Sequence, residues 1–585
     1  MKISVSIPFR KAHRSGSALV LTMVMSGIAL AILAAAMAWA ANSARLTNRS
    51  IQYSVAVEGA EAATEKVLGH MTQDYLYGGE RLISDNLTSY RTRTVPTSAD
   101  STYWNNWEFN DGQGNLNQTY VALSAASQYA VLDSTYSGLH GYVTTYDVVS
   151  HARDKSAFSG GALQSVTAGV FQEVKLARIP IFQFAMYSSG DMEVSCGQPL
   201  DITGRVHANG TLYVEPDNAM TFESDVTAVQ SILFQRNPLD LRGTTPGVGN
   251  GTVVYAEADQ PVANVPAMTL PIGTTNSPLA VREIIQPPPA GEDPDSPIGR
   301  LRYYNDSELL VDVTDSGVTI KSGDTVMPNS EVAAFVSTTS SFWDAREQKT
   351  VRPVDIDVGA LKTWSETNDT LGEALSGIPL SSVYVEDQRN LSGNQLNAVR
   401  VTNGKVLPTD GLTVATARPL YVQGNYNELD DSKLGTANTS ATRPASLVGD
   451  AITVLSQNWT DANSTNSVGS RVATDTTINA ALLTGVVETT ANHYSGGMEN
   501  FPRFLETWGP IKFTYNGSMV KMFPSQYATA AWNNNSDIYG PPTRNWAYDV
   551  NFEDVNKIPP LTPSLQKVIR GQWATVAPNK NTTTP

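Results

Sequence analysis

Residues 17–41 read SALVLTMVMSGIALAILAAAMAWAA, a run that contains no charged side chain. As a helix this run would measure roughly 37 Å at 1.5 Å per residue, enough to cross a hydrocarbon layer of about 30 Å. The residues before it contain no acid and four cations, namely Lys2, Arg10, Lys11 and Arg14. Because cationic flanks stay in the cytoplasm, we expect a single-pass membrane protein whose N-terminus is cytoplasmic.

The sequence leaves three interpretations of this N-terminus open. The first is a signal anchor that is never cleaved. The second is a secretory signal cleaved after Ala40, at the small-x-small triplet Ala38-Trp39-Ala40, although its apolar region exceeds the usual 7–15 residues. The third is a prepilin-type signal, in which cleavage after Gly16 makes Ser17 the first residue and keeps the apolar helix on the mature chain.

The chain beyond the apolar run continues a helical pattern. No proline occurs between Asn42 and the Gly78-Gly79 pair, and small or apolar residues recur at helical spacing: Ala56, Ala60, Ala63 and Val67. We therefore expect one helix over 17–77, membrane-spanning over 17–41 and amphipathic after it. The apolar stripe either packs on the protein's own globular body, as such stripes usually do, or contacts neighbouring helices.

The rest of the chain has the composition of a β-rich protein. It contains 43 Gly and 32 Pro, and only 16% of its residues are charged, which favours short strands joined by turns. In GDMEVSCGQPLDITGRVHANGTLYVEP (190–216), apolar pairs recur every eight to ten residues between turn signals. This spacing suits a meander or the rungs of a β-solenoid. The predicted fold class is α+β: a long N-terminal helix followed by a large, mainly β head, with a solenoid favoured over a sandwich.

Changes of composition along the chain suggest its domain boundaries. The expected segments are a basic leader at 1–16, the helix at 17–77, a first head subdomain of mixed helix and strand at 78–180, β-rich rungs at 181–235, a Pro- and Gly-rich excursion at 236–300, a C-terminal β-rich head at 301–576 and a polar tail at 577–585.

Several kinds of chemistry are disfavoured. A net charge of −16 argues against a nucleic-acid partner, and the single Cys196 excludes an internal disulfide or a cysteine-based metal site. Histidines lack metal-binding spacing, so His207 is expected to make a structural hydrogen bond. His493 with Ser495 and Glu499 could suggest a triad, but no nucleophile elbow supports it. The sequence therefore predicts no catalytic residue and no enzyme.

Two groups of charged residues are candidates for other functions, namely cation binding and contact with a partner. Oxygen-rich loops suited to calcium occur at three places, Asp293 and Asp295 with Glu292, Asn110 and Asp111 with Asn115, and Asp430 and Asp431 with Glu428. None has the EF-hand spacing, and such loops are usually just solvated. The phrase DAREQKTVRPVDIDV (344–358) alternates charges and is interpreted as a surface ion network, with a partner interface as the alternative.

The N-terminal stretch RSGSALVLTMVMSGIALAILAAAMAWAANSARLTNRSIQYSVAVEGAEAATE (14–65) resembles type IV pilin-like proteins, particularly PilX-type minor pilins and the K-type minor pseudopilin. Its Gly before the apolar helix, and the later Gln52, Glu61 and Ala62, match that group. Near Thr22 the start of the apolar run departs from major pilins, which have in this region a Glu that pairs with a neighbour's N-terminal amine. Phrases of the body also resemble the periplasmic part of PilX-like proteins, among them ARIPIFQFAMY (177–187), ITGRVHANGTLYV (202–214) and YSGGMENFPRFLETW (494–508).

The resemblance implies a non-enzymatic minor pilin or pseudopilin in the inner membrane, involved in assembly of a type IV pilus or a secretion-type filament. Implied partners are other pilin-like subunits, the inner-membrane assembly platform, membrane lipid and a prepilin peptidase that cleaves between Gly16 and Ser17, with methylation of the new N-terminus. Residues implied in filament helix packing are Thr22, Ala56, Ala60, Ala63 and Val67. The resemblance also raises the expectation of calcium. The alternative is a secreted or anchored β-solenoid adhesin or polysaccharide-acting enzyme.

Overall fold

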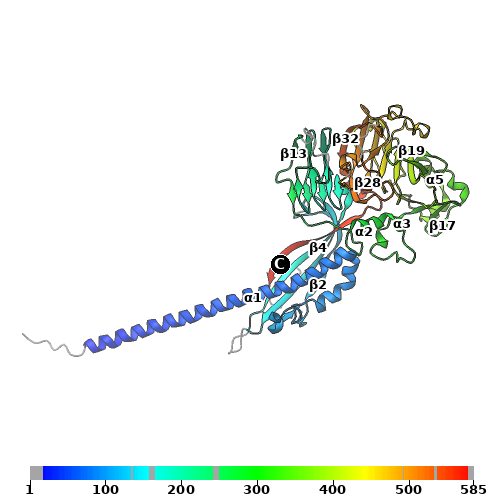
Figure 1. The fold of residues 1–585 in the computed structure, drawn as a ribbon. Helices are drawn as coiled ribbons and strands as arrows, with labels where there is room; N and C mark the ends of the chain where they lie inside the picture. The colour runs from blue at the N-terminus through cyan, green and yellow to red at the C-terminus, as the bar shows by residue number, and fades with distance from the viewer. Residues whose placement is uncertain are drawn as a thin grey trace, which may run out of the picture.

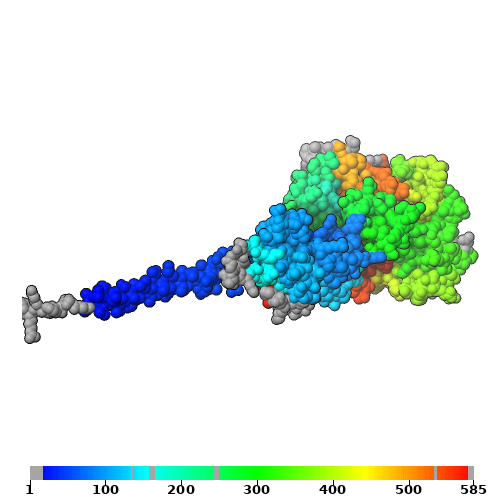
Figure 2. Space-filling model, turned by 90° about the horizontal axis from the view of Figure 1, so that it is seen from below, coloured from blue at the N-terminus to red at the C-terminus, as the bar shows by residue number. Residues whose placement is uncertain are grey.

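The computed structural model describes residues 17–133, 136–156, 165–240, 250–491, 493–532 and 537–577. A long helix, α1 (Ser17–Arg93), leaves the rest of the molecule as an isolated rod and enters a β-rich body at its other end (Figures 1 and 2). The fold class predicted from the sequence, a long N-terminal helix followed by a large β-rich head, is confirmed. The leader 1–16, and the tail apart from Ala577, lie outside the described residues.

Helix α1 extends beyond the end expected at Tyr77. Gly79 adopts φ 72° and ψ −160°, a conformation that glycine accepts without strain because it has no β-carbon. The chain then resumes helical geometry as far as Arg93, which buries Ile83 and Tyr90 in the same core as Met71. The glycine pair thus kinks the helix and does not end it.

The second half of α1 packs on an antiparallel sheet, and we call this unit the helix–sheet domain. Strand β3 lies between β4 and, on its other side, β1 and β2; β33 completes the sheet beside β4. The strands are β1 (Trp107–Asn110), β2 (Tyr120–Val131), β3 (His140–Asp154), β4 (Ala168–Pro180) and β33 (Ser564–Val576). The expected boundaries assigned 564–576 to the C-terminal head, but these residues return to the first sheet.

The head is inserted between β4 and β33 and begins with regular β turns. Residues 20 positions apart pair in parallel, as in the series Met186, Val206 and Val226. The strands of this N-terminal half-solenoid are β5 (Met186–Ser188), β6 (Met192–Val194), β7 (Leu200–Ile202), β8 (Val206–Ala208), β9 (Leu212–Val214), β10 (Met220–Phe222), β11 (Val226–Ala228), β12 (Ile232–Leu233), β13 (Val253–Tyr255) and β14 (Val262–Ala263). They form three faces that enclose an apolar interior.

A second set of strands, most of them paired in parallel, forms the C-terminal half-solenoid, whose turns are longer and less regular. Its first face contains β15 (Leu309–Thr314), β16 (Gly317–Ser322), β17 (Thr325–Val326), β21 (Ser382–Asp387), β23 (Leu412–Ala415), β25 (Ala445–Gly449), β28 (Ala481–Val486) and β31 (Met519–Pro524). The second contains β18 (Val336–Ser337), β19 (Phe342–Asp344), β20 (Lys349–Asp357), β22 (Gln395–Thr402), β24 (Leu420–Gln423), β26 (Ile452–Leu455) and β29 (Arg503–Phe504). The third contains β27 (Thr476–Asn479), β30 (Lys512–Gly517) and β32 (Thr543–Tyr548).

The two half-solenoids join into one stack although the chain builds them from opposite directions. Strand β31, near the end of the second half, pairs in parallel with β5, the first strand of the first half. One sheet of twelve strands therefore runs through the whole head, in the order β14-β11-β8-β5-β31-β28-β25-β23-β21-β15-β16-β17. The chain enters this stack in the middle, builds outward to β14, crosses to β15 near the far end and returns.

The segment expected as a Pro- and Gly-rich excursion at 236–300 is only partly a linker. Its strands β13 and β14 add a further turn to the first half-solenoid. The rest carries α2 and the crossover toward β15. The short helices of the head are α2 (Pro278–Arg282), α3 (Tyr303–Asp306), α4 (Asn329–Val332), α5 (Val358–Thr367) and α6 (Asp369–Ala374). Apolar pairs at helical or strand spacing were visible in the sequence, whereas isolated three-residue strands among prolines were not.

Candidate functional site

The first half of α1 has no partner within the described chain. Every residue from Ser17 to Ile51 is exposed, including large apolar side chains such as Leu19 (70% exposed) and Trp39 (75%). Among the described residues α1 is the one helix that is long and apolar enough to cross a membrane. Contiguous apolar surface of this extent is unfavourable in water, so the rod must be covered by lipid or by other apolar helices.

The rod also provides a spacer between the apolar run and the body. The first buried residue of α1 is Ala56, 15 residues after Ala41. At 1.5 Å per residue this is about 22 Å of exposed helix. If residues 17–41 lie in a bilayer, the helix–sheet domain stands clear of the lipid surface, and the spacer is open to other helices. Figure 2 shows the rod projecting away from the compact body.

The small-residue stripe of α1 faces the protein's own sheet. Ala56, Ala60, Ala63 and Val67 are between 0 and 1% exposed. Ala60 and Ala63 belong to a core cluster with Trp107, and Val67 belongs to the neighbouring cluster. The resemblance implied that these four residues pack against other filament helices. This expectation is corrected, because their side chains are already buried inside the subunit. Of the two interpretations left open, packing on the protein's own body is the one observed.

Thr22, the remaining residue of that group, is exposed on the apolar rod. Its Oγ1 donates a hydrogen bond to the carbonyl oxygen of Leu19 at 2.9 Å, within its own helix. A threonine that satisfies its hydroxyl in this way is compatible with an apolar environment. Thr22 carries no charge, so it cannot form an ion pair with a neighbour's amine. Of the suspected cleavage residues, Ser17 begins α1, and Gly16 lies outside the described residues.

Polar and ionic contacts hold α1 to the helix–sheet domain. Glu65 binds Arg570 of β33 through two hydrogen bonds of 2.5 and 2.8 Å. Lys66 donates to Asp100 at 2.8 Å, and this contact lowers the pKa of Asp100 to about 2. Within α1 itself, the Tyr90 hydroxyl donates to Asp74 at 2.6 Å, which joins the two sides of the kink at Gly79. The buried half of α1 is therefore fixed to the sheet by its ion pair with β33 as well as by its apolar face.

Hydrogen bonds and an ion pair also join the helix–sheet domain to the head. Gly273 N donates to the Tyr77 carbonyl at 2.9 Å, Arg300 reaches the Gly78 carbonyl, and Arg81 pairs with Asp295 at 3.3 Å. These contacts surround the kink of α1. Asp295 thus takes part in an ion pair, although the sequence suggested it as a calcium ligand.

The remaining members of the three oxygen-rich loops likewise have protein donors: in the third loop, Asp430 accepts from Ser432 N at 3.0 Å and Asp431 pairs with Lys405. Glu292 binds Arg302 through Oε1 at 2.5 Å and Oε2 at 2.7 Å. Asp111 accepts hydrogen bonds from the backbone and side chain of Asn115. In the described part of the chain, no group of three or more His, Cys, Asp or Glu side chains could hold a metal ion.

Histidine and cysteine side chains of the head are structural. His207 bonds Thr227 at 2.8 Å and Asn209 at 3.0 Å, and burial lowers its pKa to about 4. Cys196 is buried, which raises the pKa of its thiol to about 12. His493 is bonded to Thr490, whereas Glu499 binds Tyr494 and the backbone of residue 195. No hydrogen bond among the described residues joins the suggested triad.

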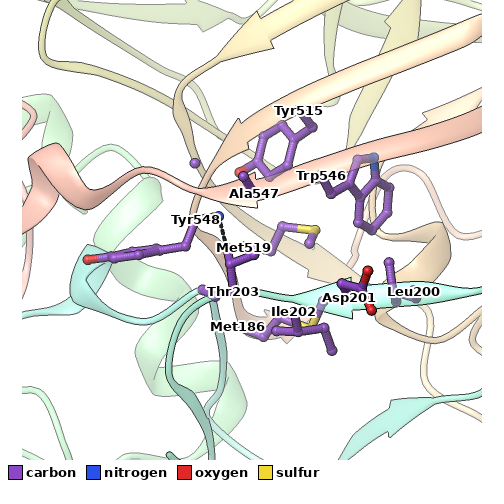
Figure 3. Close-up of a pocket in the computed structure, with 12 residues that line it drawn as sticks. Met186, Leu200, Asp201, Ile202, Thr203, Tyr515, Met519, Trp546, Ala547 and Tyr548 are labelled. Atoms are coloured by element: carbon purple, nitrogen blue, oxygen red, sulfur yellow. Dashed lines mark hydrogen bonds between the residues drawn. The ribbon is translucent and has the colours of Figure 1, made fainter. Parts of the chain in front are cut away.

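The sequence also did not indicate the seam between the half-solenoids, which is the boundary where β5 of the first half pairs with β31 of the second. Strands β7 and β32 lie side by side there without pairing, and Tyr548 N donates to Thr203 Oγ1 at 2.8 Å (Figure 3). A cavity of about 20 Å³ lies between them, lined by side chains such as Met186, Met519 and Trp546. This volume holds about one water molecule, so the cavity is a packing gap and not a ligand site.

No family model matches the chain, and no curated protein matches it. One solved structure, the competence-associated pilin ComZ from Thermus thermophilus, aligns with 90% of this chain and 98% of its own length, at 10% sequence identity. The TM-score of that alignment is 0.28, which is too low to assign either a fold or a function.

Proposed function

We propose that the protein is a non-enzymatic, membrane-anchored minor pilin-like subunit that takes part in assembling an extracytoplasmic filament. The observation that carries this proposal is the division of α1 into two halves. Its first half is apolar and entirely exposed, and its second half is buried on the subunit's own sheet. A helix with these two halves can anchor the subunit in the membrane and can later pack among the apolar helices of other subunits.

The size of the head favours a minor subunit. The solenoid inserted between β4 and β33 is much larger than the helix–sheet domain that supports it (Figure 1). A body of this bulk on every subunit would prevent the rods from packing closely along a uniform shaft. The charge-free run 17–41 supports the same conclusion, since it holds no carboxylate that could neutralise the N-terminal amine of an adjacent subunit. We therefore infer a position at one end of the filament.

The proposal includes a processing step by prepilin peptidase between Gly16 and Ser17 in the inner membrane. The first experiment is mass spectrometry of the mature N-terminus, using protein extracted from membranes of the native host. A chain that begins at Ser17 with a methylated amine is expected. A chain that begins at Ala41 has lost the whole apolar run and would overturn the proposal.

Two matched substitutions separate the competing cleavage sites. Gly16→Leu should block cleavage before Ser17 and leave the leader on the chain. Ala40→Leu removes the small residue that a secretory signal peptidase requires, and it should leave the Ser17 terminus unchanged. The reverse pattern, with processing lost only in Ala40→Leu, would identify a secreted protein.

Partnership with other subunits is tested on the exposed spacer of α1. Single cysteines in place of Ser43 and Ser54, both exposed, should form crosslinks to other pilin-like subunits in the native host. Cysteine in place of Ala60, which is buried on the sheet, provides the control and should not crosslink. Equal crosslinking from all three positions, or from none, would contradict packing through the rod.

A further inference from the structure

A groove crosses the seam of the head on the face where β6 approaches the short helix η11 (Met498–Asn500). Its volume is about 570 Å³, within the range of roughly 300–1,000 Å³ that is usual for small-ligand sites. One wall comes from the first half-solenoid and includes Gln198 and Asp217. The other comes from the second and includes Asn500, Trp532 and Arg544.

Two aromatic rings line the second wall and are held in place by hydrogen bonds. Trp532 Nε1 donates to the Tyr539 hydroxyl at 3.1 Å, and that hydroxyl donates to Asn500 Oδ1 at 3.0 Å. The Trp532 ring also meets Tyr494 edge to face, with ring centroids 5.5 Å apart. Both lining rings are half-buried, so part of their surface remains open to the groove.

The polar groups of the groove form a connected network. Arg544 Nη2 donates to the same Asn500 oxygen at 3.2 Å, and Arg544 Nε donates to the Glu499 carbonyl at 3.0 Å. Within the described part of the chain no carboxylate lies within ion-pair distance of Arg544. Glu499 Oε1 and Oε2 accept from the Tyr494 hydroxyl at 3.1 Å and from Ser195 N at 3.2 Å. Donors and acceptors are thus fixed in position before any ligand arrives.

The charge of the groove is nearly balanced. Burial raises the pKa of Glu499 to about 7, so this carboxyl is partly protonated near neutral pH. Asp217 pairs with Arg236 at 3.2 Å, and Arg544 is the cation of the opposite wall. The protein as a whole carries a net charge of −16. A strongly anionic ligand would meet an unfavourable long-range field, and a cation would find no cluster of free carboxylates.

We propose that this groove binds a neutral saccharide chain, and the proposal is independent of how the rod functions. A hexose ring has one apolar face of C–H groups, which packs on an aromatic side chain, and a rim of hydroxyl groups, which both donate and accept hydrogen bonds. The groove offers aromatic surface from Trp532 and Tyr539 together with amide, guanidinium and carboxyl groups at its rim. A ligand that spans it would contact both half-solenoids.

The test uses the full-length protein in a phosphocholine detergent, because this detergent carries no sugar that could occupy the groove. Cellotriose, maltotriose and chitotriose are the neutral probes, and trigalacturonate is the acidic comparison, all followed by isothermal titration calorimetry. We expect at least one neutral trisaccharide to bind with a dissociation constant of about 1 mM or tighter. Absence of binding by all neutral probes, or binding of trigalacturonate alone, would overturn the proposal.

Substitutions then assign the binding to the groove. Trp532→Ala should weaken binding at least about tenfold, because it removes the aromatic surface. Trp573→Ala is the matched control, since Trp573 is a half-exposed tryptophan on β33, in the helix–sheet domain. Equal affinity of these two variants would contradict the assignment.

Further variants distinguish a loss of binding from misfolding of Trp532→Ala. Trp532→Phe keeps an aromatic ring and should restore most of the affinity. Gln198→Ala shortens a side chain on the opposite wall, in the turn after β6, and should weaken binding without lowering the melting temperature. Unchanged affinity in Gln198→Ala together with full affinity in Trp532→Ala would place any observed binding elsewhere on the protein.

Discussion

The indole ring of Trp107 lies directly against the backbone of Gly59, in the space that a β-carbon on residue 59 would occupy. Gly59 belongs to the second half of α1, and Trp107 begins β1. The contact lies next to the point where the exposed rod becomes a buried helix. It therefore determines how closely the helix approaches the sheet and, through the helix, the direction in which the rod leaves the body.

Gly59→Leu should destabilise the helix–sheet domain by about 1–3 kcal/mol, because overpacking of a filled contact forces the helix or the ring to move. Gly69→Leu provides the control on the same helix, since a β-carbon there would meet nothing within 4 Å. The measurement is the thermal unfolding midpoint of the full chain in detergent. Similar midpoints for the two variants would show that the indole contact does not limit the approach.

Removal of the ring should partly rescue the first substitution. Trp107→Ala is destabilising alone, but Gly59→Leu should cost less in its presence, because the added side chain then fills vacated space. A double-mutant cycle measures this coupling, which is expected to be 0.5 kcal/mol or more for residues in direct contact. Strict additivity would indicate that the two residues do not meet.

Substitution of Asp450 should lower the stability of the head more than most single substitutions do. Its carboxylate is fully buried, pairs with Arg282 of α2 at 2.7 Å and accepts backbone hydrogen bonds from residues 526, 527 and 528 at 2.6–2.9 Å. Asp450→Ala leaves the buried guanidinium without its carboxylate and should cost about 3–5 kcal/mol. Asp295→Ala removes the exposed partner of Arg81 and should cost no more than about 1 kcal/mol. Urea unfolding of both variants compares the two.

Local sequence patterns predicted the elements of this fold but not their long-range partners. The charge-free run 17–41 and the stripe from Ala56 to Val67 indicated α1, and apolar pairs such as Met192 and Val194 marked real strands. The pairing of β33 with β4 could not be predicted, because the two strands are separated in the sequence by the whole head. Strand periodicity defines a face and not a neighbour.

The charged phrase at 344–358 illustrates the same limit. Its alternating charges predicted an exposed ion network, but Asp344 and Glu347 are buried. Glu347 pairs with Arg503 at 2.8 Å, and Asp344 accepts from the Tyr421 hydroxyl at 2.7 Å. The sequence did not indicate the groove either, since its two walls come from opposite halves of the head. Sequence alone cannot indicate which distant group neutralises a buried charge.

Glu499 should make the head less stable as the pH rises toward neutrality. Burial raises its pKa in the folded protein from 4.5 to about 7, so the folded state favours the protonated form. The stabilisation is fully present below about pH 4.5 and is lost as the pH rises through about 7. Glu499→Gln cannot ionise and should melt at a higher temperature than the wild type at pH 8, with no such advantage at pH 4.

The control for this prediction is Glu553→Gln, an exposed glutamate on the 3₁₀ helix Val550–Glu553. Other buried carboxyls also contribute to the pH dependence of the whole protein, so the informative quantity is the difference between each variant and the wild type. That difference should change with pH for Glu499→Gln, and Glu553→Gln gives the effect of the same chemical change at an exposed glutamate. A flat difference at both positions would mean that Glu499 titrates in its ordinary range.

Ile28 tests whether the apolar half of α1 lies in a bilayer. It is exposed near the middle of the charge-free run, and an arginine at the centre of a membrane-spanning helix costs about 2.5–3.5 kcal/mol on insertion. Ile28→Arg should therefore shift much of the protein from the membrane fraction to the carbonate-soluble or degraded fraction. Ser54→Arg places the same charge on the exposed spacer, 13 residues after Ala41, and should leave membrane retention unchanged. If both variants stay in the membrane as the wild type does, lipid is not what covers the rod, and other apolar helices must cover it from the start.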